Sequence, residues 1–365
     1  MINPFRQLII LLLPFLCTAC VPTEVVDDLQ FIHAAGFDYI EDSDLVRATV
    51  SVPIYGFGQE QESASFESET ITAEGRTAKQ IRARMNSKSP KVLENSKIEA
   101  VIYNEKIAEQ GLYEYVDTYD RDPKVGQRVY LAVYAGSTQE LLEKKLPIES
   151  EISRYIADVI EQNVEHTDIP NTNMHIFTYR YFQEGMDPFL PYLRMDGDQI
   201  QIKGMAVFKD DVMKGYINIE DTFIMKMLVE SLSEGTYEVD VDGENFATLQ
   251  NLNAKTRYSV KNHTLSPPEI TADIVVTGYI NEYSGDTLND NVLKEIDVKM
   301  KEQIKNDAEN LITRFQEMGV DPTGLGFQVK TRTRNWNQAE WLEQYPDVKV
   351  NVNVTSKITH AGVVE

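Results

Sequence analysis

The chain has 365 residues, enough for two or three domains, and carries a formal net charge of −23 at pH 7. This acidity excludes proteins that bind nucleic acid or anionic lipid through their own charge. Both cysteines, Cys17 and Cys20, lie within the first 20 residues. The rest of the chain therefore has no thiol for a disulfide, a zinc site or a nucleophile, and it must be stabilised by hydrophobic cores.

The first 20 residues have the pattern of an exported lipoprotein. Arg6 precedes an apolar run from Leu8 to Leu16, which is too short to span a membrane but has the length of the apolar part of a secretory signal. Thr18-Ala19-Cys20 then resembles a bacterial lipobox, although Cys17 stands where leucine is usual. A plain cleaved signal with an incidental cysteine is the alternative. We expect residues 1–20 to be the signal peptide and Cys20 the lipidation site.

Extended and helical patterns alternate over residues 21–187. A turn at Glu41–Asp44 separates two runs rich in β-branched residues, which predicts a hairpin. Thr77 is suited to cap a helix on which Ile81 and Met85 share one face. The expected strands are 31–40, 45–55, 97–103 and 128–134, with another near residue 71, and the expected helices are 77–86, 105–119, 138–144 and 151–164. This alternation predicts an N-terminal mixed α/β domain at 21–187.

Breaker residues cluster between residues 165 and 195, where we place the domain boundary. They are Pro170, Gly185, Pro188 and Pro191. The C-terminal domain is expected at 195–365, opening with a hairpin that turns at Asp210-Asp211. Its predicted strands are 200–208, 212–217, 237–242, 247–252, 257–263, 270–283 and 347–358, with helices at 221–232 and 288–318 and a turn at 321–326.

The helix predicted over 288–318 is the longest element. Its charged residues lie opposite an apolar stripe, which is typical of a helix that packs on a sheet and is hydrated on its other side. The stripe consists of Leu293, Ile296, Met300, Ile304, Ala308, Leu311, Ile312 and Phe315, and Gly319 is expected to end the helix. The predicted fold class is therefore α+β, with two or three mixed α/β domains. The C-terminal one is an antiparallel-rich sheet packed against one long helix, with a further split near residue 285 as the alternative.

No coherent catalytic or metal-binding constellation occurs in the sequence. The histidines lack metal-binding spacing, and there is no His-Glu-x-x-His helix or Gly-x-Ser-x-Gly motif. Asp240 and Asp242 favour a hairpin turn over a calcium loop, because the terminal glutamate of such a loop is missing. We therefore predict no catalytic, cofactor-binding or metal-binding residue, no cofactor and no enzymatic activity. The histidines are His33, His166, His175, His263 and His360.

Several motifs occur in the order and spacing of a known family. The first half contains Ile71-Thr-Ala-Glu-Gly-Arg-Thr, then Ser-Pro at 89–90, then the segment 98–111 and Arg121-Asp-Pro. The second half contains the hairpin 204–216, the long helix, Asp321-Pro-Thr-Gly-Leu-Gly and the alternating strand before Gly362. Behind a lipobox, this order resembles the Ger(x)C family, the lipoprotein C subunits of spore germinant receptors. Val21-Pro-Thr-Glu replaces the tryptophan and acidic residue that many members have after the lipid cysteine.

The resemblance implies a non-enzymatic subunit that acts in assembly or signalling during spore germination. It places the protein on the outer face of the spore inner membrane, held by the lipid on Cys20. The implied partners are two integral-membrane subunits, of the A and B types, which together with the C subunit respond to nutrients such as amino acids, sugars or nucleosides. The sequence does not settle which subunit binds the nutrient. Because B subunits resemble transporters, they are the more natural site, and this chain is assigned a role in assembly or signalling.

An extracytoplasmic solute-binding lipoprotein of a transporter is the alternative function. That class needs two doubly wound lobes with a deep cleft between them, whereas the second half here is predicted to consist of hairpins. A solute binder would show a deep interlobe cleft lined with aromatic and polar groups. A receptor subunit would show a broad, shallow apolar patch. We expect the patch.

Overall fold

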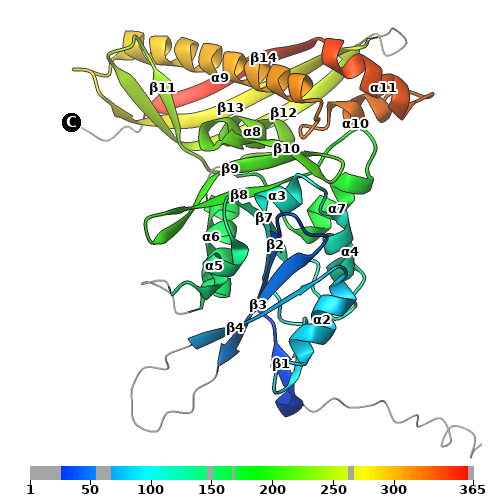
Figure 1. Ribbon diagram of the computed structural model, residues 1–365. Coiled ribbons are helices and arrows are strands. Elements are labelled where there is room, and N and C mark those ends of the chain that lie inside the picture. The colour runs from blue at the N-terminus through cyan, green and yellow to red at the C-terminus, as the bar shows by residue number, and fades with distance from the viewer. Residues whose placement is uncertain (1–25, 55–66, 146–150, 167–168, 262–266, 361–365) are drawn as a thin grey trace, which may run out of the picture.

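The computed structural model describes residues 26–54, 67–145, 151–166, 169–261 and 267–360. The predicted lipidation site, Cys20, lies outside these ranges. Figure 1 shows a lower layer of helices around a large sheet, and an upper layer in which a second sheet packs against one long helix.

The lower layer is built on an eight-stranded sheet. Its central strands run parallel, and antiparallel hairpins complete both edges. The strand order is β10-β9-β8-β7-β6-β2-β3-β4. The bounds are Ala34–Tyr39 (β2), Val46–Ile54 (β3), Glu67–Gly75 (β4), Ala100–Asn104 (β6), Tyr130–Tyr134 (β7), Phe189–Asp196 (β8), Gln199–Lys209 (β9) and Val212–Asn218 (β10).

Helices cover both faces of this sheet, because its central strands are apolar on both sides. One face packs against α2 (Ala78–Asn86), α3 (Glu105–Ala108), α4 (Tyr113–Asp120) and α7 (Met174–Phe182). The other packs against α5 (Thr138–Glu143) and α6 (Ile152–His166). A small parallel pair, β1 (Leu29–Phe31) and β5 (Val92–Glu94), follows the short helix η2 (Val26–Asp28).

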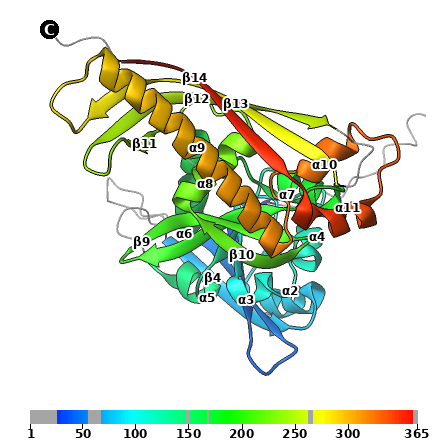
Figure 2. The ribbon, with the colours of Figure 1, turned by 90° about the horizontal axis from the view of Figure 1, so that it is seen from above.

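The upper layer is a four-stranded sheet in the order β11-β12-β13-β14. Burial alternates along its long strands, so one face is covered and the other is largely exposed. Helix α8 lies between this sheet and β9, and α9 lies beside β14 and β11 (Figures 1 and 2). The bounds are Tyr237–Asp240 (β11), Phe246–Lys261 (β12), Glu269–Tyr283 (β13), Val350–His360 (β14), Ile219–Val229 (α8), Asp290–Met318 (α9), Leu325–Lys330 (α10), Gln338–Gln344 (α11) and Tyr345–Asp347 (η3).

The long helix α9 forms as predicted. Asn289 accepts hydrogen bonds from the backbone N–H groups of Asn291 and Val292, and Gly319 ends the helix in the left-handed conformation with φ 68°. All but one of the predicted stripe residues, from Ile296 to Phe315, are buried. The predicted α+β class, with an antiparallel-rich C-terminal sheet packed on one long helix, is confirmed.

Several element predictions were wrong for identifiable reasons. The helix expected over 105–119 is two helices, because Gly111 has φ +117°. The strands expected at 247–252 and 257–263 are one strand, β12, which continues through a bulge at Asn251. The breakers between 165 and 195 also concealed two elements, α7 and β8. The predicted turn at 321–326 leads into α10, which the sequence patterns did not indicate.

The predicted boundary between residues 187 and 195 lies where the two halves share a sheet. Strands β9 and β10 follow that boundary, yet β9 pairs with β8 along its length. One hydrophobic core also includes Ile156 of α6, Ile274 of β13 and Ile304 of α9. The domain limits stay a prediction, but the two halves do not have separate cores.

Candidate functional site

Most residues considered at the sequence level are not brought together. His33 pairs with Glu151, with 2.6 Å between Nδ1 and Oε1, while His175 lies in the first turn of α7. Among the described residues, no three His, Cys, Asp or Glu side chains come together in a group that could hold a metal ion. Within the same ranges, no helix has the length and apolarity needed to cross a membrane.

A buried polar junction joins the loop after α7 to the loop after α9. Asp187 accepts a hydrogen bond from the backbone N–H of Asp321 at 2.7 Å, and its own N–H donates to the Asp321 carbonyl at 2.9 Å. The Asp187 carboxylate also pairs with Lys209 of β9, at 3.2 Å. The Asp187 carboxylate therefore joins its own loop to the Asp321 loop, more than 100 residues later in the chain, and to Lys209 of β9.

The Asp321 carboxylate accepts hydrogen bonds from groups within its own loop. One carboxylate oxygen accepts from the Leu325 N–H at 2.9 Å and from the Thr323 hydroxyl at 3.1 Å, and the other accepts from the Gly326 N–H at 2.7 Å. Burial raises its pKa to about 6 despite these donors. Burial likewise raises the pKa of Asp187, although Lys209 opposes the shift.

Arg180 of α7 donates hydrogen bonds to both loops of the junction. Its Nε donates to the Asp187 carbonyl at 3.0 Å, and its guanidinium also donates to the Pro322 carbonyl. The same group lies over the Phe189 ring, 4.5 Å from the centroid. Burial lowers the pKa of Arg180 to about 10, so the side chain remains a cation at neutral pH.

Two glycines let the backbones approach each other at the junction. Gly185 has φ +84°, and a Cβ there would lie 2.5 Å from the carbonyl carbon of Gly326. The Gly185 carbonyl accepts a hydrogen bond from the Phe327 N–H at 2.7 Å. The junction is therefore closed by direct backbone contact, and its polar groups hold the two halves together instead of facing a ligand.

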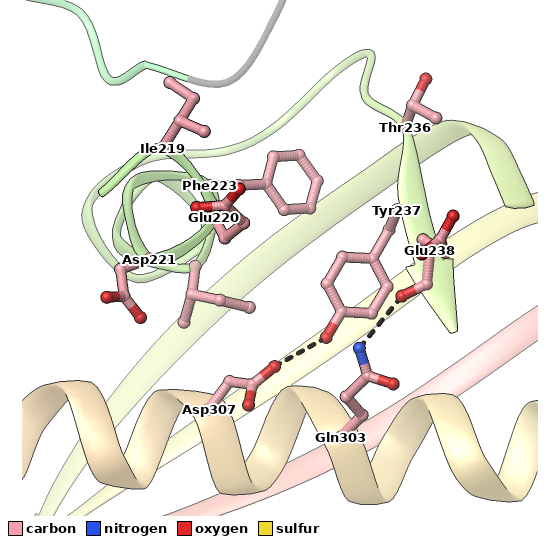
Figure 3. A pocket seen from close by; sticks show the side chains of 10 residues that line it. Ile219, Glu220, Asp221, Phe223, Thr236, Tyr237, Glu238, Gln303 and Asp307 are labelled. Carbon is pink, nitrogen blue, oxygen red and sulfur yellow. Dashed lines mark hydrogen bonds between the residues drawn. The ribbon is translucent and has the colours of Figure 1, made fainter. Parts of the chain in front are cut away.

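Figure 3 shows a different site, a pocket of about 460 Å³ between α8, β11 and α9. The Tyr237 hydroxyl donates to Asp307 at 3.0 Å, and the Gln303 amide donates to the Glu238 carbonyl at 3.0 Å. Burial raises the pKa of Asp307, and the Tyr237 hydrogen bond opposes the shift. Phe223 stacks on Tyr237 at 5.7 Å between ring centroids. These contacts bind β11 to α9.

Several polar side chains of the pocket in Figure 3 are engaged with neighbouring residues. Asp221 is held by Arg314 of α9, and the Tyr237 hydroxyl is engaged with Asp307. No histidine, cysteine, serine or lysine lines it among the described residues. Its carboxylates and rings form an acidic surface groove.

Sequence reasoning missed the junction almost entirely. The segment Asp321–Gly326 was interpreted as a turn and as a family motif, and Gly185 as a breaker, without any contact between them. The informative signal was the glycine-containing turn at 321–326 and the breaker Gly185, together with Arg180 among the aromatic and apolar residues of α7. A breaker-rich segment next to a buried charge indicates a close backbone contact.

Both halves of the chain match family models of spore germination proteins. The family model of the spore germination protein N-terminal domain matches residues 23–195, and that of the spore germination B3/GerAC-like C-terminal domain matches residues 203–362. The spore germination protein GerQC of Bacillus cereus is 31% identical over 364 residues, which cover 99% of each chain. This chain belongs to the GerAC-like family of spore germination proteins.

Two further comparisons agree with this family. The putative spore germination protein YfkR of Bacillus subtilis (strain 168) is 23% identical over 387 residues, covering 98% of this chain and 97% of YfkR. The crystal structure of the GerBC protein matches 90% of this chain and 98% of its own, with a TM-score of 0.55 and 15% identity. That likeness shows the shared fold.

Proposed function

We propose that this chain is the lipid-anchored C-type subunit of a nutrient germinant receptor. It acts in assembly or signalling, together with A- and B-type integral-membrane subunits, on the outer face of the spore inner membrane. The observation that carries the proposal is similarity to a germination protein along 99% of the chain. The lipobox-like Thr18-Ala19-Cys20 supports the anchor, since the acyl chains of a lipoprotein supply stable membrane binding.

A patch of exposed and half-buried aromatic side chains supports a role in assembly. It consists of Tyr113 on α4 and Tyr179, Tyr181 and Phe182 on α7, and is called the aromatic patch below. Tyr113 stacks on Tyr181 at 4.4 Å between centroids, and Phe182 packs edge-on to both. Phe182 is 64% exposed and Tyr179 49% exposed. Aromatic residues clustered at the surface are typical of protein interfaces.

The alternative, a solute-binding lipoprotein, is not favoured by these contacts. In a solute binder, the region between two lobes is an open cleft that closes on its ligand. Here the two halves meet through Arg180, Asp187 and Asp321, which are buried and hydrogen-bonded to one another's segments. This closed junction fits a subunit that acts as one body.

Co-purification from spore membranes, followed by mass spectrometry, tests the proposal. The wild-type chain should recover A- and B-type subunits, and Phe182→Asp should reduce the recovery about 30-fold, the effect of losing one interface hot spot. Leu342→Asp on α11, where the side chain is 41% exposed, is the matched control and should leave recovery unchanged. Failure of the wild type to recover either subunit would contradict the proposed function.

Cys20→Ala tests the anchor separately. The variant should fold normally but leave the membrane fraction when the partner subunits are absent, because the chain's net charge of −23 gives it no electrostatic attraction to anionic lipid. Retention of Cys20→Ala on membranes without partners would show that another segment provides the anchor.

A further inference from the structure

A second pocket, of about 260 Å³, opens between α2 and α4 above β2 and β3. Its walls are mostly apolar, and four polar side chains also line it: Arg82, Asn95, Thr118 and Asp122. The walls include Ile32, Phe37, Val50, Ile81, Met85 and Tyr119. Engineered apolar cavities of about 150 Å³ already hold a benzene molecule, so this pocket has room for a ring or a branched chain together with a polar head group.

One polar group in the pocket wall has no partner. The Tyr119 side chain is 7% exposed, and its hydroxyl is open to solvent and forms no hydrogen bond with the described residues. Its only recorded ring contact is with Phe37, edge-on at 6.3 Å. A hydroxyl that lines a pocket and has no protein partner can form its hydrogen bond with water or with a ligand. The hydroxyl therefore indicates a position for a hydrogen-bonding group inside the pocket.

A cation stands at the mouth of the same pocket. Arg82 of α2 donates from Nη1 to Asn95 Oδ1 at 2.9 Å and from Nη2 to the Leu93 carbonyl. These contacts fix the guanidinium, and its Nε–H donates to no described residue. Two carboxylates lie near the guanidinium. Glu94 pairs with Lys124 at 2.8 Å, and Asp122 accepts hydrogen bonds from the Lys124 N–H at 3.0 Å and the Asn95 amide at 3.5 Å. The mouth thus offers unused donors and a positioned positive charge.

We propose that this pocket binds a small apolar carboxylate. The hydrocarbon body would fill the apolar chamber, and the carboxylate would accept hydrogen bonds from the Arg82 guanidinium and the Tyr119 hydroxyl. A guanidinium and a phenol are both donors, so an anionic acceptor satisfies them better than an ammonium or a neutral alcohol does. This inference rests on the pocket alone and does not depend on the receptor assignment. It adds a ligand site to a subunit for which the sequence indicated none.

Isothermal titration of the purified full chain with phenylacetate tests the site, with 2-phenylethanol as the neutral probe. We expect saturable binding of phenylacetate with a Kd of about 1 mM or tighter, as for efficient ligands of this size. The alcohol should bind at least about tenfold more weakly, because it loses a hydrogen bond to a charged group. Arg82→Met and Tyr119→Phe should each weaken phenylacetate binding.

Filling the pocket provides the decisive control. Ala78 is half-buried on α2 and lines the pocket, whereas Ala83 on the same helix is exposed and does not. Ala78→Leu should abolish binding, and Ala83→Leu should leave it unchanged, with both variants folded because leucine is a good helix former. The absence of saturable binding to the wild type, equal affinity for the alcohol, or unchanged binding to Ala78→Leu would each overturn the proposal. Co-purification with receptor subunits would be unaffected by any of these results.

Discussion

The junction around Asp187 and Asp321 and the pocket beside Tyr119 bury polar groups in opposite ways. At the junction the carboxylates accept hydrogen bonds from backbone N–H groups and a hydroxyl, and backbones touch at Gly185. In the pocket, space of about 260 Å³ remains next to an unpartnered hydroxyl. Buried polar groups that satisfy one another hold a fold together, whereas an unsatisfied group beside open space is available to a ligand.

The difference bears on how the two halves of the chain are coupled. The junction joins residues matched by the N-terminal family domain to residues matched by the C-terminal one. A partner or ligand that acts on one half would therefore act on a molecule whose halves share a sheet, a core and a hydrogen-bonded junction.

Gly185→Ala should have the largest effect. The added Cβ would lie 2.5 Å from backbone atoms of Gly326 and Phe327, neither of which can rotate away. We expect a loss of about 4 kcal/mol in the free energy of unfolding, combining steric overlap with φ strain. Gly197→Ala is the control, since Gly197 also has positive φ but no atoms within 4 Å, and it should cost about 1 kcal/mol. Equal effects in urea denaturation would show that the close approach at the junction is unimportant.

Arg180→Met should have the second largest effect, a loss of about 3 kcal/mol in the free energy of unfolding. Methionine fills much of the same volume but leaves the carbonyls of Asp187 and Pro322 without a donor and removes the cation above Phe189. Arg154→Met on α6 is a suitable control, because Arg154 is exposed and pairs only at the surface with Asp158. A stability of Arg180→Met within 1 kcal/mol of the wild type, roughly the size of a surface change, would contradict the account.

The raised pKa of Asp321 should make the stability of the folded chain depend on pH. Its pKa is raised to about 6 in the folded chain from about 3.9 in an unfolded one. The folded state therefore binds this proton more tightly, so the contribution is fully present below about pH 4 and is lost as pH rises to about 6, by up to about 3 kcal/mol. Asp321→Asn should lack this dependence in thermal unfolding measured from pH 4 to 7. If the stability of the wild type and of Asp321→Asn changed with pH in the same way, the group that titrates would be a residue other than Asp321.

Two tyrosine-to-phenylalanine changes should give the smallest effects and the sharpest contrast. The Tyr345 hydroxyl donates to the Val320 carbonyl at 2.7 Å beside the junction, so Tyr345→Phe should cost about 1–2 kcal/mol. The Tyr119 hydroxyl has no partner among the described residues, so Tyr119→Phe should leave the stability of the ligand-free protein unchanged or slightly raised. If Tyr119→Phe destabilised the chain as much as Tyr345→Phe, the pocket would not contain an unsatisfied group.

The sequence predicted regular elements well where local signals were strong. Thr77 caps α2 as expected, the Glu41–Asp44 turn joins β2 to β3, and the stripe from Ile296 to Phe315 is buried. Periodicity and caps depend on residues within a few positions of each other, so they can be read locally. The α+β class followed from the order of these elements.

The junction and the shared sheet could not be predicted in this way. The pairing of β8 with β9, and the contact of Gly185 with Gly326, depend on segments that converge only in the folded chain. Breakers such as Pro188 and Pro191 indicated a linker, yet Pro191 lies inside β8. The role of Cys20 stays a prediction, because that residue lies outside the described ranges.

The central claim is that the two halves form one cooperative unit joined at Asp187 and Asp321. Differential scanning calorimetry of the full chain at neutral pH measures this directly. We predict one unfolding transition whose calorimetric enthalpy equals the van't Hoff enthalpy, and a lower midpoint without broadening for Arg180→Met. Two separate transitions in the wild-type chain, with Arg180→Met shifting neither, would contradict the claim.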